Sequence, residues 1–259
     1  MDLSLNGKHA VVCGGSQGIG LASAQELARN GAIITLVARN LERLETARNS
    51  LERVTEHSVL AVDFSKPEDL HEKISARIVN HPAQILINNT GGPPAGSAHT
   101  ATLQEYQQAF SQHVLCNQVL LQALLPGMRA AGYGRIINII STSVKQPIPG
   151  LGVSNTIRGA VASWAKTLAT ELGPEGITVN NMLPGFTQTG RLDAIIAAKA
   201  KQAGLDAAVV AKQMRAAVPA ARFADASEAA NAIAFLASPA AAYINGINLP
   251  VDGGRTSTL

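Results

Sequence analysis

Cysteine and aromatic side chains are scarce in this chain, which has two cysteines and 3% aromatic residues. Cys13 and Cys116 stand far apart in the sequence and in no paired spacing, so we expect neither a disulfide framework nor a metal site. Free cysteines suit a reducing compartment, and the cytoplasm is therefore the predicted location.

Long apolar runs and a strong charge of one sign are also missing. No uninterrupted run approaches the ~20 apolar residues of a membrane span, and residues 1–8 have no apolar core behind a basic head. The formal net charge is only +3, and the basic residues form no polybasic tail. We therefore expect a soluble protein that has neither a membrane nor a nucleic acid as its partner.

What the sequence does contain is an alternation of short β-branched runs with longer helical stretches. The short runs are apolar on both faces, as parallel strands covered by helices on both sides should be. A hydrophobic content of 46% suits one globular domain over residues 1–259. The sequence predicts a single doubly wound α/β domain with a seven-stranded parallel sheet. The predicted strands are Ala10 to Cys13, Ile33 to Val37, Val59 to Val62, Ile85 to Ile87, Arg135 to Ile140, Thr178 to Met182 and Ile247 to Val251.

Capping signals mark the starts of several helices. Thr102 with Glu105, and Asp225 with Glu228, each have the spacing of a capping box. Ser65 is expected to cap the helix that follows the third strand.

Residues 187–222 depart from the alternation; they are alanine-rich, and we expect two helices there. Ligands of open α/β sheets bind beyond the carboxyl ends of the strands, so this insertion is placed to act as a substrate lid. It carries six basic and two acidic side chains, a local charge of +4. Such a charge could attract an anionic handle, such as a carrier phosphopantetheine or coenzyme A, but solvated helix faces would have the same composition.

A glycine-rich turn follows the first predicted strand directly and precedes a helix. Glycines at 14, 18 and 20 allow a sharp turn, a close approach to a pyrophosphate, and tight packing of the helix on the strand. The free amides at the start of that helix would then face the phosphates. A tight strand-to-helix turn can also need glycine with no ligand present, but here it opens the first unit of a seven-stranded chain, as in a Rossmann fold.

With this turn and four later motifs, the chain resembles the short-chain dehydrogenases/reductases over nearly its whole length. The later motifs are Asp63 after the third strand, Asn88-Asn89-Thr90-Gly91 after the fourth, Pro184-Gly185 with Thr189, and Val251-Asp252-Gly253-Gly254. The resemblance implies that Asp63 contacts an adenine and that Thr189 holds a nicotinamide amide. The predicted cofactor-binding residues are Gly14, Ser16, Gln17, Gly18, Ile19, Gly20, Arg39, Asp63, Asn89, Gly91, Arg158, Pro184, Gly185, Thr187 and Thr189.

The end of the second strand indicates which cofactor is used. A carboxylate there would bind the ribose diol of NAD and repel a 2′-phosphate, but the chain has Ala38-Arg39-Asn40. Arg39 can offer a charge-assisted fork to a phosphate, although it could also be a solvated surface residue. NADP(H) is the predicted cofactor.

The catalytic positions depart from the family. The resemblance implies a serine that polarises the carbonyl, a tyrosine thirteen residues later, a lysine four beyond that, and an asparagine in the preceding helix. The residues that stand there are Ser141, Ser154, Arg158 and His113. Ser154 is a weak acid without the ring that carries the family's hydroxyl, whereas Arg158 stays cationic and could still bind a ribose. His113 could replace the proton donor, since histidine titrates near neutral pH, or it could be structural.

Two segments resemble an atypical subgroup of the family that is similar to 3-oxoacyl-carrier-protein reductases. They are Gly91-Gly92-Pro93-Pro94 and Ser154-Asn155-Thr156-Ile157-Arg158. The sequence thus predicts an NADP(H)-dependent oxidoreductase acting on a small-molecule carbonyl or alcohol, with a 3-oxoacyl thioester as one candidate. The alternative is a dinucleotide-binding pseudoenzyme that serves as a sensor or assembly subunit. The family also implies a homodimer or homotetramer formed through helices at about 103–129 and 154–172.

Overall fold

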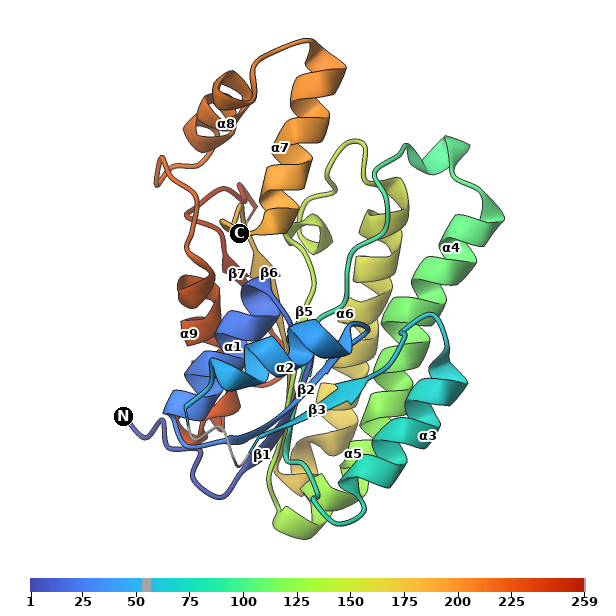
Figure 1. Cartoon of the computed structure of the whole chain (residues 1–259), viewed down its shortest axis with the longest axis vertical. Helices are drawn as coiled ribbons and strands as arrows, with labels where there is room; N and C mark the ends of the chain where they lie inside the picture. The colour runs from blue at the N-terminus through green and yellow to red at the C-terminus, as the bar shows by residue number, and fades with distance from the viewer. Residues whose placement is uncertain (53–56, 259) are drawn as a thin grey trace.

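The computed structural model describes residues 1–52 and 57–258 as a three-layered α/β fold. Its seven strands form one parallel sheet, as predicted, and helices cover both faces (Figure 1). The order of the strands in the sheet is β3-β2-β1-β4-β5-β6-β7. The strands are β1 (His9–Cys13), β2 (Ile33–Ala38), β3 (Ser58–Ala61), β4 (Ile85–Asn88), β5 (Gly134–Ile139), β6 (Ile177–Pro184) and β7 (Asn248–Val251).

Nine α-helices are found among the described residues, and none of them is long and apolar enough to cross a membrane. Their bounds are α1 (Gly18–Arg29), α2 (Leu41–Asn49), α3 (Pro67–Ile78), α4 (Leu103–Phe110), α5 (Cys116–Ala131), α6 (Gly152–Leu172), α7 (Gly190–Ala203), α8 (Ala207–Ala216) and α9 (Ala226–Ala237).

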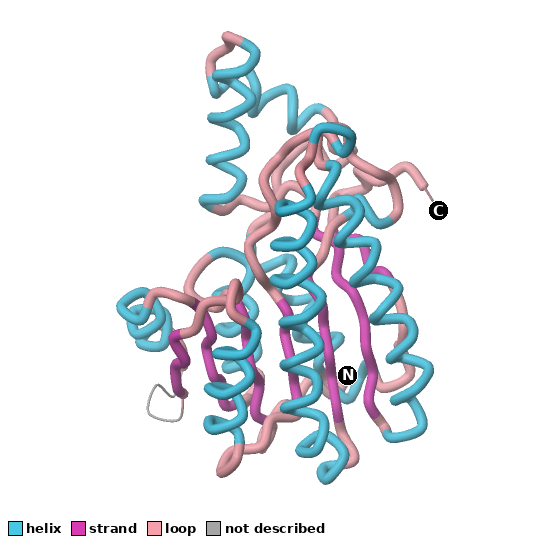
Figure 2. Tube along the Cα trace, turned by 90° about the vertical axis from the view of Figure 1, so that its right-hand side faces the viewer, coloured by secondary structure: helices cyan, strands magenta, loops and turns pink. Residues whose placement is uncertain are grey.

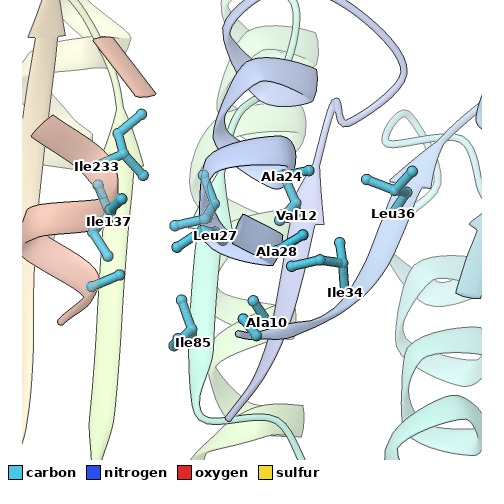
Figure 3. Packing of buried hydrophobic residues seen from close by; sticks show 14 of the residues in the cluster. Ala10, Val12, Ala24, Leu27, Ala28, Ile34, Leu36, Ile85, Ile137 and Ile233 are labelled. Carbon is cyan, nitrogen blue, oxygen red and sulfur yellow. The ribbon is translucent and has the colours of Figure 1, made fainter. Parts of the chain in front are cut away.

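Each face of the sheet has its own apolar core. One core joins α1, α2 and α9 to the sheet, and the other joins α3, α5 and α6. Figure 3 shows the first core, where Leu27 and the small Ala24 and Ala28 of α1 lie over the central strands. The small alanines let α1 approach the sheet closely, and the Leu27 side chain fills the space between the helix and the sheet. Truncating such a fully buried leucine to alanine costs about 2–5 kcal/mol of stability.

An asparagine ladder crosses four strands just below the carboxyl edge of the sheet. Asn88 on β4, Asn138 on β5, Asn181 on β6 and Asn248 on β7 are aligned in register. Each side-chain amide donates to the next side-chain oxygen, over 2.8 to 2.9 Å. These bonds satisfy polar groups that would be costly to bury alone, and they tie together the strands that carry the candidate site.

The helix starts follow the sequence signals with one exception. The capping boxes of Thr102 with Glu105 and of Asp225 with Glu228 are both present. The expectation for Ser65 is wrong: α3 begins after Lys66, whose side chain makes no capping bond. The Ser65 amide instead donates to the carboxylate of Asp63, 3.0 Å away, which keeps the residue in the turn after β3.

The helix expected over 103–129 is interrupted. A π-helical segment, Ser111–Leu115, separates α4 from α5. The wider π turn inserts one extra residue, a feature that is frequent at functional sites. His113 lies in this segment and is almost completely buried.

The two helices expected within 187–222 are α7 and α8. They form a hairpin that projects beyond the carboxyl ends of the strands (Figures 1 and 2). The hairpin has a small apolar core of its own, which contains Leu192, Ile196, Val210 and Met214. This hairpin is therefore a separately packed unit above the edge of the sheet where the predicted site lies.

Candidate functional site

The glycine turn after β1 is packed so tightly that side chains are excluded. A Cβ on Gly20 would collide with the carbonyl oxygen of Gly14, and one on Gly14 would collide with the backbone of Asn89. Gly14 and Gly18 also have positive φ angles of 60° and 56°, which other residues rarely adopt. The turn therefore needs glycine at these positions both for its conformation and for its contacts.

The start of α1 presents free backbone donors at this turn. Gln17 is the N-cap, and its side chain makes no capping hydrogen bond. The amides of the first helical residues, Gly18, Ile19 and Gly20, have no intrahelical acceptor, because a helix leaves its first turn unpaired. Together with Ser16, which precedes the cap, these amides could hold an anionic group.

Arg39 and Asp63 lie close enough to interact at the ends of β2 and β3. Arg39 is exposed directly after β2, where no carboxylate stands. The pKa of Asp63 is lowered chiefly by the hydrogen bond from the Ser65 amide, and further by the positive charge of Arg39. The structure thus brings together the two residues predicted to bind the adenosine end of the cofactor.

The segment after β6 reaches back to the glycine turn. A Cβ on Gly18 would contact the Thr189 methyl group at 3.3 Å, so Thr189 lies beside the start of α1. Thr189 also caps α7, because its Oγ1 accepts from the Leu192 amide, 3.5 Å away. Thr187 Oγ1 donates to the carbonyl of Gly185 over 3.4 Å, and a Cβ on Gly185 would collide with Asp252. Pro184 closes β6 just before this turn.

Ser141 follows β5 at the same edge of the sheet. Its Oγ accepts a hydrogen bond from the Ser143 amide over 3.1 Å. No described residue accepts the hydroxyl hydrogen of Ser141, so this hydrogen can be donated to a ligand. A fixed hydroxyl of this kind can stabilise negative charge that develops on a carbonyl oxygen.

Arg158 of α6 is buried against the ends of β4 and β5. Its Nη1 donates to the carbonyl of Ile139 at 3.1 Å, and its Nη2 donates to the carbonyl of Thr90 at 3.5 Å. Burial lowers its pKa to about 10, and the charge of Arg191 adds to the effect, so Arg158 remains a cation at neutral pH. The arginine is therefore a fixed positive charge in the middle of the site.

His113 lies beside the same threonine. Its Nδ1 is 2.6 Å from Thr90 Oγ1, and its Nε2 is buried without a partner among the described residues. Burial, together with the charge of Arg158, lowers the pKa of His113 to about 3. The expectation that this histidine titrates near neutral pH is therefore wrong, because the imidazolium form is too costly at a buried position next to an arginine.

Ser154 is partly buried in the first turn of α6, and no hydrogen bond of its side chain is found in the described structure. Its neighbour Asn155 has a clear structural part. The side-chain Nδ2 of Asn155 donates to the backbone carbonyl of Ile148 over 2.9 Å, and its Oδ1 accepts from the backbone amide of Ile148 over 3.4 Å. These bonds fix the loop between β5 and α6, which passes over the edge of the site.

Sequence reasoning missed three residues of this cluster. Thr90 stands where the family has alanine, and this difference was the signal that it contacts something particular. Arg191 was counted only as part of the lid charge, and Gly92 only as part of a motif. The structure brings all three beside Arg158.

The α7–α8 hairpin contains a hollow of about 530 Å³, which Phe186, Leu205, Val210 and Met214 help to line. No predicted catalytic residue lines it, so it belongs to the hairpin rather than to the edge of the sheet. Within residues 1–52 and 57–258, no three His, Cys, Asp or Glu side chains gather as metal ligands would.

Comparison with known proteins shows similarity over the whole chain. The family described as Enoyl-(Acyl carrier protein) reductase matches residues 14–256. The chain is 31% identical to gluconate 5-dehydrogenase of Gluconobacter oxydans (strain 621H), over 99% of this chain and 97% of that protein. It is 32% identical to the 3-oxoacyl-acyl-carrier-protein reductase FabG of Pseudomonas aeruginosa, over 97% and 98% of the two chains.

Solved structures agree with this result. L-Sorbose reductase from Gluconobacter frateurii, complexed with NADPH and L-sorbose, has a TM-score of 0.93 and 35% identity, and the match covers 100% of both chains. An NADPH-dependent reductase involved in bacilysin biosynthesis has a TM-score of 0.91 and 29% identity, over 97% and 99% of the two chains. The similarity thus includes the α7–α8 hairpin as well as the sheet.

Proposed function

Since this chain belongs to the short-chain dehydrogenase/reductase family, we propose that it is an NADP(H)-dependent oxidoreductase that interconverts a carbonyl and an alcohol. The observation that carries the proposal is the convergence of the glycine turn, Thr189 and Ser141 at one edge of the sheet. The first two supply a cofactor cradle, and the third supplies a donor for the reacting oxygen.

The residues present fit a dinucleotide. The tight glycine turn keeps side chains out of the space before α1, where the unpaired amides of that helix point. NADPH would supply the hydride when bound there. Thr189 and Gly185 would hold its nicotinamide end, and Asn89 would support the turn through the bond from its Nδ2 to the carbonyl of Gly14, at 3.4 Å.

Arg39 supports NADP(H) over NAD(H). It is exposed at the end of β2 beside Asp63, and neither of the two residues directly after that strand is a carboxylate. The guanidinium group can form two charge-assisted hydrogen bonds with a 2′-phosphate. Two solved relatives, one complexed with NADPH and one described as NADPH-dependent, support this choice.

We infer that the Ser154 to Arg158 segment defines a subgroup that lacks the family's tyrosine and lysine. Ser141 donates its free hydrogen to the substrate oxygen, and His113 acts in its neutral form as a positioning residue for Thr90. Solvent then supplies the proton, because no phenol stands at position 154. A positioned general acid contributes about 10²–10⁴-fold, so turnover should be slower by that order than with the tyrosine present.

We also propose that the α7–α8 hairpin is the substrate lid, because it projects over the edge that holds Ser141. The names of the relatives point to two kinds of substrate: small sugar-derived carbonyls or acids, and 3-oxoacyl thioesters of a carrier protein. Both kinds belong in a substrate screen.

The test is a carbonyl screen that follows NADPH consumption by the purified chain, beside a direct titration of NADPH binding. The restored double variant, Ser154→Tyr with Arg158→Lys, is run in parallel. We expect slow reduction by the unaltered chain and a gain in the double variant. If both proteins bind NADPH and neither reduces any carbonyl, the enzyme proposal is wrong and the chain is a cofactor-binding module.

A further inference from the structure

Two arginines from different parts of the chain converge beside Gly92. A Cβ built on this glycine would lie 3.7 Å from Arg158 Nη2 and 3.8 Å from Arg191 Nη2. Arg158 comes from the buried wall of the site, and Arg191 comes from the first turn of α7, at the base of the hairpin. The two guanidinium groups thus border the same small region of space beside Gly92.

The part of the chain that the structure describes does not neutralise either arginine. Among the described residues, no carboxylate lies within ion-pair distance of Arg158 or Arg191. Two of the five N–H groups of Arg158 donate to backbone carbonyls, which leaves donors of its fork free. Arg191 is exposed and makes no hydrogen bond within the described structure.

Two like charges at close range destabilise each other, and burial makes the repulsion stronger. Other arginines of the chain differ from this pair because a carboxylate neutralises them: Arg129 pairs with Glu175, and Arg222 pairs with Glu228. An uncompensated pair of cations at the edge of the sheet that also holds Ser141 is the arrangement expected of a binding site whose ligand brings the negative charge.

We propose that Arg158 and Arg191 bind the carboxylate of the substrate in the space beside Gly92, so that the substrate is a short oxo acid or the corresponding hydroxy acid. A carboxylate has two oxygens in a plane, and each can accept from one guanidinium group. This proposal depends on the proposed oxidoreductase function for the identity of the ligand as a substrate.

The position of the pair limits the length of that acid. Arg158 donates a hydrogen bond to the carbonyl of Ile139, the last residue of β5, and Ser141 follows only two residues later. The carboxylate and the reacting carbonyl would therefore be separated by few bonds. Because Arg191 belongs to α7, the bound acid would also join the hairpin to the wall of the site.

The test measures binding without turnover. The protein is saturated with NADP⁺, and pyruvate, acetoacetate and 4-oxopentanoate are each titrated by calorimetry beside their methyl esters. An oxidised cofactor cannot reduce a ketone, so only affinity is measured. We expect at least one acid to bind about tenfold or more tightly than its ester, the range for hydrogen bonds to charged groups. If no acid binds more tightly than its ester, the proposal is wrong.

Variants connect that preference to the two arginines. Arg191→Gln should reduce the preference for the acid over the ester, because one of the two guanidinium donors is lost. Lys201→Gln, which removes a charge elsewhere on α7, should change this preference less than about twofold. Gly92→Asp should also remove the preference by placing a tethered carboxylate beside the two arginines, in the space that the substrate carboxylate would use. An unchanged preference in Arg191→Gln would overturn the assignment.

The anion that contacts the two arginines could also be a phosphate of the cofactor. The affinity for NADPH distinguishes this phosphate from a substrate carboxylate. The proposal expects Arg191→Gln to bind NADPH as the unaltered chain does. A loss of NADPH affinity, with acids and esters bound equally, would mean that the arginines serve the cofactor. Acid binding without any hydride transfer would leave the site in place and contradict the oxidoreductase function instead.

Discussion

The two glycine-containing turns at the carboxyl edge of the sheet use the same residue type for opposite purposes. After β1, a Cβ on Gly14 or Gly20 would collide with neighbouring backbone. After β4, a Cβ on Gly91 would meet nothing within 4 Å, and one on Gly92 would reach only two guanidinium groups. The first turn is packed closely against neighbouring backbone, whereas the second leaves room beside positive charge.

This difference separates the part of the site that follows the family from the part that departs from it. The turn after β1 has the expected motif and packs through its backbone. The region after β4 contains Thr90, His113, Arg158 and Arg191, whose contacts depend on side chains from distant elements. Substitutions on the two sides should therefore have different consequences.

The largest effect on chemistry should come from the substrate side. We expect Ser141→Ala to lower turnover by about 10²–10³-fold, because the alanine removes a donor to the developing oxyanion. The affinity for NADPH should not change, since the cradle lies on the other turn. Steady-state kinetics and a fluorescence titration of NADPH test this. An equal loss of turnover and of NADPH affinity would show that the two turns do not act separately.

The next effect compares the two turns directly. Gly20→Ala should lower the free energy of unfolding by about 1–3 kcal/mol, because the methyl group collides with the carbonyl of Gly14. It should weaken NADPH binding as well. Gly91→Ala, with open space around it, should stay within about 0.5 kcal/mol of the unaltered chain. Urea unfolding of both variants measures the difference, and similar losses would contradict the comparison.

A smaller effect concerns the choice of cofactor. The unaltered chain should bind NADPH more tightly than NADH, and Arg39→Asp should shift the ratio of the two dissociation constants by about tenfold or more towards NADH. The added carboxylate repels a 2′-phosphate and can bind a ribose diol. Equal affinities of the unaltered chain for the two cofactors would show that Arg39 does not contact the phosphate.

The smallest effect should be that of His113 on activity near neutral pH. Its pKa of about 3 lies below the usual value of 6.5, so the neutral ring is present throughout the range from pH 6 to 8. His113→Asn should leave the shape of the pH profile of turnover unchanged over that range. A profile that follows a group near pH 6.5 and disappears in the variant would restore the histidine as a proton donor.

The same pKa has a consequence for stability. Between pH 6.5 and about 3, the unfolded chain binds a proton at His113 that the folded chain does not. The stability from this group is thus complete above pH 6.5 and is lost as the pH falls. From pH 7 to 4.5, the unfolding free energy of His113→Asn should fall less than that of the unaltered chain. Some decrease should remain in the variant, because burial also lowers the pKa of His9.

The sequence predicted the seven-stranded sheet and the two helices within residues 187–222 because alternating apolar runs and capping signals are local. It did not predict the π-helical segment, since one inserted residue hardly changes a helical pattern. The acidity of His113 depends on burial and on Arg158, which lies 45 positions later. The meeting of Arg158 with Arg191 depends on how α7 is placed over the sheet, which no local pattern specifies.

The most direct test of the account is the fate of the hydride. NADPH that carries deuterium on one face of its nicotinamide should be mixed with the purified chain and the best carbonyl of the screen, and the alcohol analysed by mass spectrometry. We predict that deuterium from one labelled face only appears on the carbinol carbon, at a rate that Ser141→Ala lowers. Complete retention of the label in the cofactor with every carbonyl, although NADPH is bound, would contradict the account.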